Sequence, residues 1–350
     1  MADAGSPSDV FELPDTIEAI EYYYDQGMTD GLPVIPPTPE RVQQFLDAAA
    51  LDPKDVLGTR PSRNWVVTAG KVAINAVMAG CLPEYAPVVM ASVRALLDPD
   101  FNASAIAETA STSAPLMVIN GPIRRQLDIN CSWNLFGPGH RANATIGRTL
   151  RLVLINVCNV RSGVSERSNF GHPGRYTFCI GENEESNPWE PYHVEKGYPI
   201  DSSTVSLFSV CHPIEAPNWV DHHPEGILET ISHIIASYIR CHGYVTIIFG
   251  PEHAQKIAAA GWSKRKTKER IAERVAALRP TVAFDEQRVG AVGGAWYPGM
   301  DDPTQSTVST TPDRITVLVA GGEGGGHSTV LPSWGMGLIS KSVMKPIKSA

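Results

Sequence analysis

Hydrophobic residues recur along this chain in two patterns that predict different elements. Short continuous apolar runs predict strands buried on both faces, because a strand with one solvent-facing side would alternate instead. These runs lie at 116–120, 175–180, 204–210, 244–249 and 315–320. Apolar residues spaced three and four apart predict helices with one apolar face. These helices lie at 65–79, 86–97, 141–157, 225–239, 252–259 and 264–278.

Polar residues near the N-terminus indicate where the first helices begin. Asp15 with Glu18 three residues later matches a capping box, in which side chains satisfy the free N–H groups of the first turn. Thr38 followed by Pro39 predicts a second helix start, since proline lacks the N–H that would be left unpaired there. We expect residues 1–14, which are polar and acidic, to form a flexible tail.

Three of the predicted strands end in glycine turns. Gly121-Pro122 and Gly250-Pro251 each follow a strand and precede a helical segment, and Gly321 follows the last apolar run. A repeated strand–turn–helix unit predicts an α/β fold with a mostly parallel or mixed sheet, flanking helices and an N-terminal helical region. The predicted organisation is a tail at 1–14, a mainly helical region at 15–110 and an α/β region at 111–350, with a long loop at 283–312.

Composition narrows the class of protein. Hydrophobic residues make up 43% of the 350 residues and charged residues 19%, which predicts a folded core rather than disorder. The net charge of −8 disfavours nucleic acid and anionic membranes as partners. No apolar run approaches the roughly 20 residues that span a bilayer. The six cysteines form no C-x-x-C pair, so we expect reduced thiols, as in a cytoplasmic protein. We also expect the protein to form homo-oligomers.

Carboxylates and histidines concentrate in the loops that follow the predicted strands. In open α/β sheets, ligands bind beyond the carboxyl ends of the strands. Glu182 and Glu184 follow the strand at 175–180, and together with His172 just before that strand they are candidates for acid–base catalysis. A loop held by hydrogen bonds is the alternative. The candidate ligands for a divalent metal are His172, His193, His222 and His223. For the last two of these, helix capping is the competing interpretation.

A glycine-rich run at 321–326 predicts a turn whose backbone amides hold an anion or a polarised carbonyl. The candidate binding residues are Gly322, Gly324, Gly325, His327 and Ser328. The run lacks the Gly-Lys-[Ser/Thr] of a phosphate-binding loop, and His327 replaces the last glycine of a dinucleotide fingerprint, so a dinucleotide cofactor is not expected. A plain tight turn is the alternative.

Two further segments carry candidate chemistry. His140, Arg141 and Asn143 begin the longest predicted helix, where free amides favour a carboxylate or phosphate. A well-capped helix start is the alternative. Cys81 lies between two predicted helices, and the amides of the second would stabilise a nucleophilic thiolate. A buried inert cysteine is the competing interpretation.

Several long motifs together resemble a poorly characterised bacterial group that occurs with, or as the long partner of, UGSC-motif (seleno)proteins. The similar segments are 30–42, 76–85, 118–124, 137–147 and 171–176, and the resemblance spans roughly residues 28–335. The short UGSC proteins carry Cys-Gly-Ser-Cys or its selenocysteine equivalent, which implies thiol or selenol chemistry. That motif is absent here, so the resemblance implies a redox centre on a partner chain or on an isolated cysteine such as Cys81.

Taken together, the sequence favours an enzyme or an obligate enzyme subunit. Its substrate would be a small anionic or carbonyl-bearing molecule, and the reaction would use thiol or acid–base chemistry in a cleft at the strand carboxyl ends. One alternative is a non-catalytic partner of a UGSC-type thiol or selenol protein. Another is a metal-dependent lyase or hydrolase, for which a divalent metal is the candidate cofactor.

Overall fold

The computed structural model describes residues 12–13, 15–221, 223–238, 244–278, 310–334 and 340–348. Its α-helices are α1 (Thr16–Asp25), α2 (Pro39–Ala49), α3 (Ala69–Ala79), α4 (Ala86–Leu96), α5 (Ala103–Glu108), α6 (Ile123–Gln126), α7 (Arg141–Asn156), α8 (Tyr192–Glu195), α9 (Pro224–Ser237), α10 (Pro251–Ala259) and α11 (Lys264–Leu278). Its strands are β1 (Val56–Arg60), β2 (Trp65–Thr68), β3 (Ala114–Asn120), β4 (Cys179–Gly181), β5 (Thr204–Val210), β6 (Ile214–Pro217), β7 (Val245–Phe249), β8 (Ile315–Val319), β9 (His327–Pro332) and β10 (Val343–Pro346). The predicted loop at 283–312 lies almost entirely outside the described residues, as does the predicted tail.

Two four-stranded mixed sheets form the centre of the molecule. The first has the strand order β10-β5-β3-β4 and the second β6-β9-β7-β8. In the first sheet β3 pairs parallel with β4 and antiparallel with β5, and in the second β7 pairs parallel with β8 and antiparallel with β9. The parallel partners are joined by helical crossovers, which confirms the α/β class predicted from the sequence.

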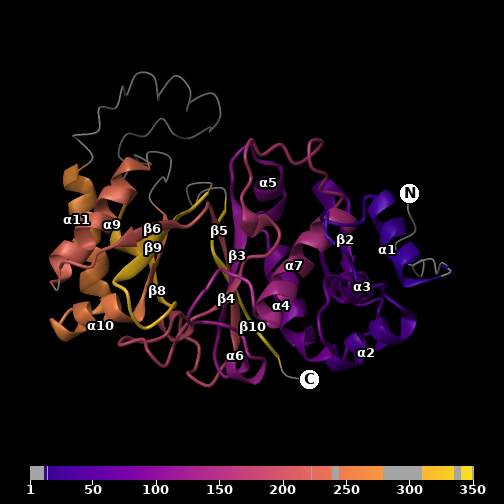
Figure 1. Ribbon diagram of the computed structural model, residues 1–350, viewed down its shortest axis with the longest axis horizontal. Helices are drawn as coiled ribbons and strands as arrows, with labels where there is room; N and C mark the ends of the chain where they lie inside the picture. Colours follow the sequence, from indigo (N-terminus) through magenta and orange to yellow (C-terminus); the bar gives the residue numbers. More distant parts are fainter. Residues whose placement is uncertain are drawn as a thin grey trace.

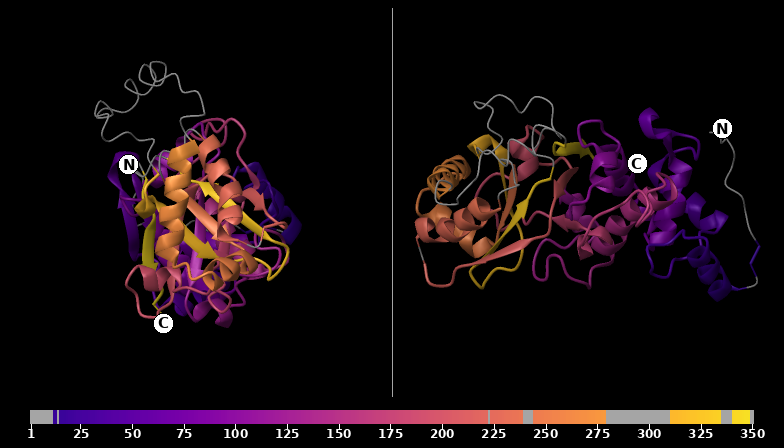
Figure 2. Two further views of the ribbon diagram at one scale, coloured as in Figure 1. Left: turned by 90° about the vertical axis from the view of Figure 1, so that its left-hand side faces the viewer. Right: turned by 90° about the horizontal axis from the view of Figure 1, so that it is seen from above.

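The elements stack in four layers (Figure 1). Strand alternation gives each sheet an inner apolar set, so that Leu116 and Val118 of β3 lie in one buried cluster with Ile248 of β7 and Leu318 of β8. The outer face of the first sheet packs against α3, α4 and α7, and that of the second against α9, α10 and α11. Figure 2 shows α9 and α11 lying across the second sheet when it is viewed from that side.

Three strands of each sheet share one topology. A central strand continues through helices to a parallel neighbour, and an antiparallel strand is then added on the other side of the central strand. The fourth strands differ in chain order, since β6 precedes the second sheet's unit and β10 follows both units. Both central strands end in Gly-Pro, at Gly121 and Gly250. A Cβ on either glycine would collide with a backbone carbonyl oxygen, that of Ser202 or of His327, where the antiparallel strand enters. The glycine turns seen in the sequence thus mark two copies of one β-α-β-β unit.

The N-terminal region carries α1 to α5 together with a small β1–β2 hairpin. The predicted helix starts are confirmed, since Asp15 accepts hydrogen bonds from the first turn of α1 and Thr38 caps α2. The helix predicted from residue 65 begins only at Ala69, because Trp65–Thr68 pairs with β1 as strand β2. In the part of the chain that the structure describes, no helix is long and apolar enough to cross a membrane.

Strand prediction was right for four of the buried strands, but it missed β9, which lies inside the second sheet, and it was poor for the short strands. The run at 204–210 matches β5, and those at 116–120, 244–249 and 315–320 match β3, β7 and β8 within two residues. The strand predicted at 175–180 shrinks to β4, because Pro173–Arg175 forms a 3-10 turn instead. The short strands β6 and β10 lie at sheet edges, where half-exposed residues give no continuous apolar run.

We predict that Gly121→Ala strongly destabilises the fold. Its backbone φ is +84°, and a Cβ there would also overlap the carbonyl oxygen of Ser202. Gly163 is the matched control, because its φ is +77° but nothing lies within 4 Å of a Cβ. The left-handed conformation alone costs about 1–2 kcal/mol in either variant. Chemical denaturation should show Gly121→Ala at least about 2 kcal/mol less stable than Gly163→Ala, and equal losses would contradict the overlap.

Candidate functional site

Two of the predicted acid–base residues, Glu182 and Glu184, lie together at the carboxyl ends of β3 and β4. Asn120, the last residue of β3, donates from Nδ2 to Glu182 Oε2 at 2.6 Å and to Glu184 Oε1 at 2.9 Å. The Gly121 N–H also donates to Glu184 Oε1, at 2.7 Å. One amide group therefore holds both carboxylates, and the parallel pairing of β3 with β4 brings them to it.

The protein itself supplies the charges and donors that this carboxylate cluster needs. Arg124, whose side chain is 2% exposed, pairs with Glu184 at 3.0 Å and with Glu185 at 3.1 Å. Burial raises the pKa of Glu182 above its usual value, although the Tyr192 N–H donates to its carboxylate at 2.7 Å. Because all of these carboxylates already have partners, the arrangement is typical of an ion network that holds the fold together.

The predicted metal ligands do not come together. His193 is buried beside the carboxylate cluster, with Nδ1 3.8 Å from Glu184 Oε1 and Nε2 3.3 Å from the Ile200 carbonyl. His223 is exposed at the start of α9, and His222 lies outside the described residues. Within the described ranges, no group of three or more histidine, cysteine, aspartate or glutamate residues is arranged to hold a metal ion.

His172 lies at the opposite end of β4 from Glu182. Its Nδ1 accepts a hydrogen bond from the Gly174 N–H at 3.1 Å, and its ring packs edge-on against Phe178 with the centroids 5.5 Å apart. Four residues of extended chain, roughly 13 Å, separate Phe178 from Glu182. The predicted acid–base residues thus divide between the two ends of one strand.

The predicted anion binders at the start of α7 serve the protein's own backbone. Arg141 donates to the Gly80 carbonyl from Nε at 3.2 Å and from Nη2 at 3.0 Å, which ties α7 to the end of α3. Asn143 is buried, accepts from the Asn130 N–H at 2.8 Å and donates to the Asn130 carbonyl at 3.1 Å. His140 is the N-cap residue of α7, and its side chain makes no capping hydrogen bond. The contacts of Arg141 and Asn143, rather than a capping side chain at His140, therefore hold the start of this helix.

The predicted glycine-rich cradle is the turn between β8 and β9. Its members Gly322, Gly324 and Gly325 lie between Gly321 and Gly326, two glycines with positive φ. The Gly326 N–H donates to Glu252 Oε2 at 2.9 Å, so a carboxylate of the protein already lies against this turn. A Cβ on Gly322 would overlap the ring of Trp133, which is 63% exposed and stands over the turn. Close approach of an aromatic ring explains the glycine here.

His327 and Ser328, at the start of β9, contact two different neighbours. His327 Nε2 accepts from Trp219 Nε1 at 3.2 Å near the surface. Ser328 Oγ lies 2.8 Å from His253 Nδ1, and His253 Nε2 lies 3.2 Å from the Asn218 carbonyl. A serine–histidine pair resembles a nucleophile with its base. Ser328 and His253 are only 5% and 1% exposed, however, so the pair fastens β9 to α10.

Cys81 is buried where α3 ends, with Sγ 3.3 Å from Thr149 Oγ1 of α7. Burial raises the pKa of the thiol to about 11. The sequence suggested that helix amides would stabilise a thiolate here, but desolvation acts in the opposite direction and dominates. The environment matches the alternative of a buried inert cysteine.

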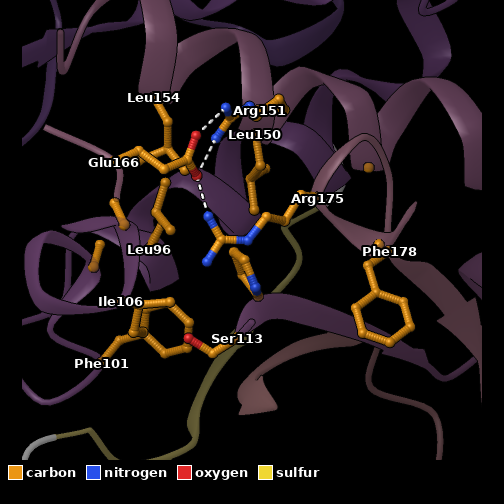
Figure 3. A pocket seen from close by; sticks show the side chains of 15 residues that line it. Leu96, Phe101, Ile106, Ser113, Leu150, Arg151, Leu154, Glu166, Arg175 and Phe178 are labelled. Carbon is orange, nitrogen blue, oxygen red and sulfur yellow. Dashed lines mark hydrogen bonds and ion pairs between the residues drawn. The ribbon is translucent and has the colours of Figure 1, made fainter. Parts of the chain in front are cut away.

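A small cavity, partly open to solvent, lies at the amino ends of β3 and β4. Its apolar wall is formed by residues from α4, α5 and α7 together with the segment before β4, and includes Leu96, Phe101, Ile106, Leu150, Leu154 and Phe178. This is the end of the first sheet opposite to the one that the sequence pointed to. Figure 3 shows Leu150, Arg151 and Leu154 of α7 on one side of the cavity and Phe101, Ile106 and Ser113 on the other.

Three charged side chains line one part of this cavity (Figure 3). Glu166, 7% exposed, receives two hydrogen bonds from Arg151, at 2.9 and 2.5 Å, and is paired on its other side with Arg175. Arg175 also donates to the Ser111 carbonyl at 2.9 Å. Two guanidinium groups and one carboxylate leave a net charge of +1 in a largely apolar surrounding.

Unpaired polar atoms gather around the same charged cluster. Arg175 Nε, Ser113 Oγ and His172 Nε2 are buried and have no hydrogen-bond partner among the described residues. Arg175 and Ser113 line the cavity, and His172 packs behind it against Phe178. Buried polar atoms rarely stay unpaired. Asn120 Oδ1, Arg124 Nε and His193 Nδ1 at the carboxylate cluster are unpaired as well, so what distinguishes this end of the sheet is the cavity beside Arg175 and Ser113.

Sequence reasoning found part of this site. His172 was a candidate for acid–base chemistry, and both His172 and Arg175 belong to the 171–176 segment that carries part of the family resemblance. Arg151 lies inside a helix, and Glu166 lies on an irregular segment with no motif, so neither gave a signal. Only the return of the 161–178 segment over α7 brings these residues together.

A scan against protein-family models and searches of curated proteins and of solved structures each found no match to this chain. The resemblance to the UGSC-associated group therefore remains an expectation from the sequence. Functional inference for this protein depends on the chemistry and geometry of its own residues.

We predict that Cys81 reacts slowly with alkylating reagents in the folded protein. With a pKa of about 11 against a usual 9.0, the thiol carries about 100-fold less thiolate than an ordinary cysteine at the same pH. Timed iodoacetamide labelling at pH 7.5 with peptide mass spectrometry should modify the partly exposed Cys131 before Cys81. Both should react quickly in denaturant, and fast native labelling of Cys81 would restore it as a nucleophile.

We also predict that His172 stays neutral in the folded protein well below pH 6.5. Burial first, and then the charges of Arg175 and His212, lower its pKa from 6.5 to about 4. The unfolded chain takes up this proton as the pH falls through 6.5, but the folded protein does not until about 4. His172 therefore contributes stability above pH 6.5 that is lost between pH 6.5 and about 4.

The measurement is the free energy of unfolding across this pH window for the wild type and for His172→Gln. Between pH 6.5 and 4, the free energy of unfolding of the variant should fall less than that of the wild type. His233, a histidine 59% exposed on α9, supplies the control His233→Gln, which should leave the decline unchanged. An NMR titration that places the imidazole pKa of His172 near 6.5 would contradict the prediction.

Proposed function

We propose that the protein is an enzyme, or the substrate-binding subunit of one, that takes a small anionic molecule into the cavity at the amino ends of β3 and β4. The observation that carries this proposal is the Arg151–Glu166–Arg175 cluster, which adds a net charge of +1 to an otherwise apolar cavity. Small-molecule sites are concave and mostly apolar, with a few polar groups that fix orientation.

The cluster suits an anion because its positive charge is not fully compensated. Glu166 neutralises one guanidinium, and the second remains in a site where water screens it poorly. Arg151 and Arg175 are 16% and 12% exposed, so neither reaches freely into solvent. A bound anion would restore neutrality, and an arginine fork gives such an anion a defined orientation.

A second thiol lies near this site. Cys211 is buried beside Arg175, with Sγ 3.8 Å from Ser111 Oγ. It does not line the cavity and is at least as buried as Cys81, so burial argues against it as a nucleophile for the same reason.

The first test is thermal unfolding with a panel of anions and their neutral counterparts. The panel pairs 2-oxo acids, carboxylates and phosphate monoesters with amides and alcohols of similar shape. At a concentration of 100 times Kd, a ligand of the folded state adds about 2.7 kcal/mol of stability. We predict that at least one class of anion stabilises the protein and that its neutral counterpart does not.

Arg175→Met should abolish the stabilisation, and Glu166 would keep Arg151 as its partner in that variant. Arg125→Met is the matched control, since Arg125 is 74% exposed at the far end of β3 and should not affect binding. Stabilisation that persists in Arg175→Met, or a panel without effect on the wild type, would contradict the proposal.

A further inference from the structure

The charge in the cavity sets a limit on the charge of its ligand. Two arginines and one glutamate leave +1, which one carboxylate balances. A phosphate monoester carries about −1.5 to −2 near neutral pH, so it would leave uncompensated negative charge in an apolar site. Burying unpaired charge is costly, and the balance therefore favours a singly charged anion.

The unpaired donors agree with a carboxylate. Arg175 Nε and Ser113 Oγ are both buried and lack partners among the described residues. Both residues line the cavity, and two such donors match the acceptor sites of one carboxylate group. His172 Nε2 is also buried and unpaired, but His172 packs against Phe178 and is not part of the cavity lining.

The remainder of the cavity wall is apolar. Beyond the charged cluster, Leu96, Phe101 and Ile106 lie together on the side where α4 and α5 close the cavity (Figure 3). These side chains offer no hydrogen bonds to a second polar group on the ligand. Transfer of a methylene chain or a small ring from water into this part of the cavity would add about 0.8 kcal/mol of binding free energy for each CH₂.

From this arrangement we infer that the ligand is a monocarboxylate with a short apolar body. Its carboxylate lies against Arg175 and Ser113, and its body extends along Leu96, Phe101 and Ile106. The inference depends on the proposed anion cavity and adds the chemical class and the orientation of the ligand. It makes no use of the carboxylate cluster at the other end of the sheet.

The test is isothermal titration of the full-length protein with acetate, butyrate, hexanoate and octanoate. Affinity should rise roughly fourfold for each added CH₂ until the cavity is full and then level off. 1-Hexanol and hexylamine are the controls for the body alone, and neither should bind at the concentration where hexanoate saturates. Inorganic phosphate and sulfate are the controls for charge alone.

Three variants test which residues contact the carboxylate of the ligand and which contact its apolar body. Arg175→Met should weaken hexanoate about ten- to hundredfold, and Ser113→Ala about two- to tenfold. Ile106→Phe fills the apolar end, so it should weaken hexanoate and octanoate but leave butyrate nearly unchanged. This last variant keeps the charged cluster intact and separates loss of binding from loss of folding. Circular dichroism and the melting temperature check each variant.

The outcomes separate this inference from the function on which it depends. Binding of phosphate or sulfate that requires Arg175, without binding of any carboxylate, overturns the monocarboxylate and leaves the anion cavity standing. Equal affinity for hexanoate and 1-hexanol overturns the role of the charge. If no anion of any class binds, both the inference and the proposed function fall.

Discussion

The contact on which the rest of this structure depends is the apolar layer between its two sheets. Val118 of the first sheet and Ile248 and Leu318 of the second lie in one fully buried cluster. Because the inner faces are used for each other, the helices must cover the outer faces, and the four-layer order follows. The layer also fixes which ends of the strands are filled and which remain open.

At the carboxyl ends, the space is filled by charged side chains that satisfy each other. Asn120 bridges Glu182 and Glu184, Arg124 adds the opposite charge, and Lys264 of α11 places a further cation near Glu182. Each carboxylate of this network has a partner, although Arg124 Nε and His193 Nδ1 are buried without a hydrogen bond. The network therefore marks a place where the two halves are joined, and a substrate would have to break several bonds to enter.

At the amino ends of β3 and β4, an uncompensated charge lies beside a cavity. Glu166 holds Arg151 and Arg175 in position but compensates only one of them, and the cavity beside them is lined mainly by carbon. Charges are paired at the carboxyl ends of the sheet, whereas one charge stays uncompensated at the amino ends. The residue types in the sequence therefore point to the carboxyl ends, and the geometry favours the amino ends. Carboxylates and histidines are equally conspicuous in sequence whether or not they are already paired.

The sequence by itself determined the α/β class, the long helices and most of the buried strands, because these follow from local periodicity and from glycine and proline turns. It missed β9, whose polar residues break the apolar run. It also pointed to His172 and to its motif. Only the tertiary structure decided the pairing of the strands, the duplication of one unit and the partners of each polar group. Arg151 and Glu166 lack a motif, and their meeting with Arg175 depends on how the 161–178 segment returns over α7. Such contacts are set by packing between distant residues, which local patterns do not encode.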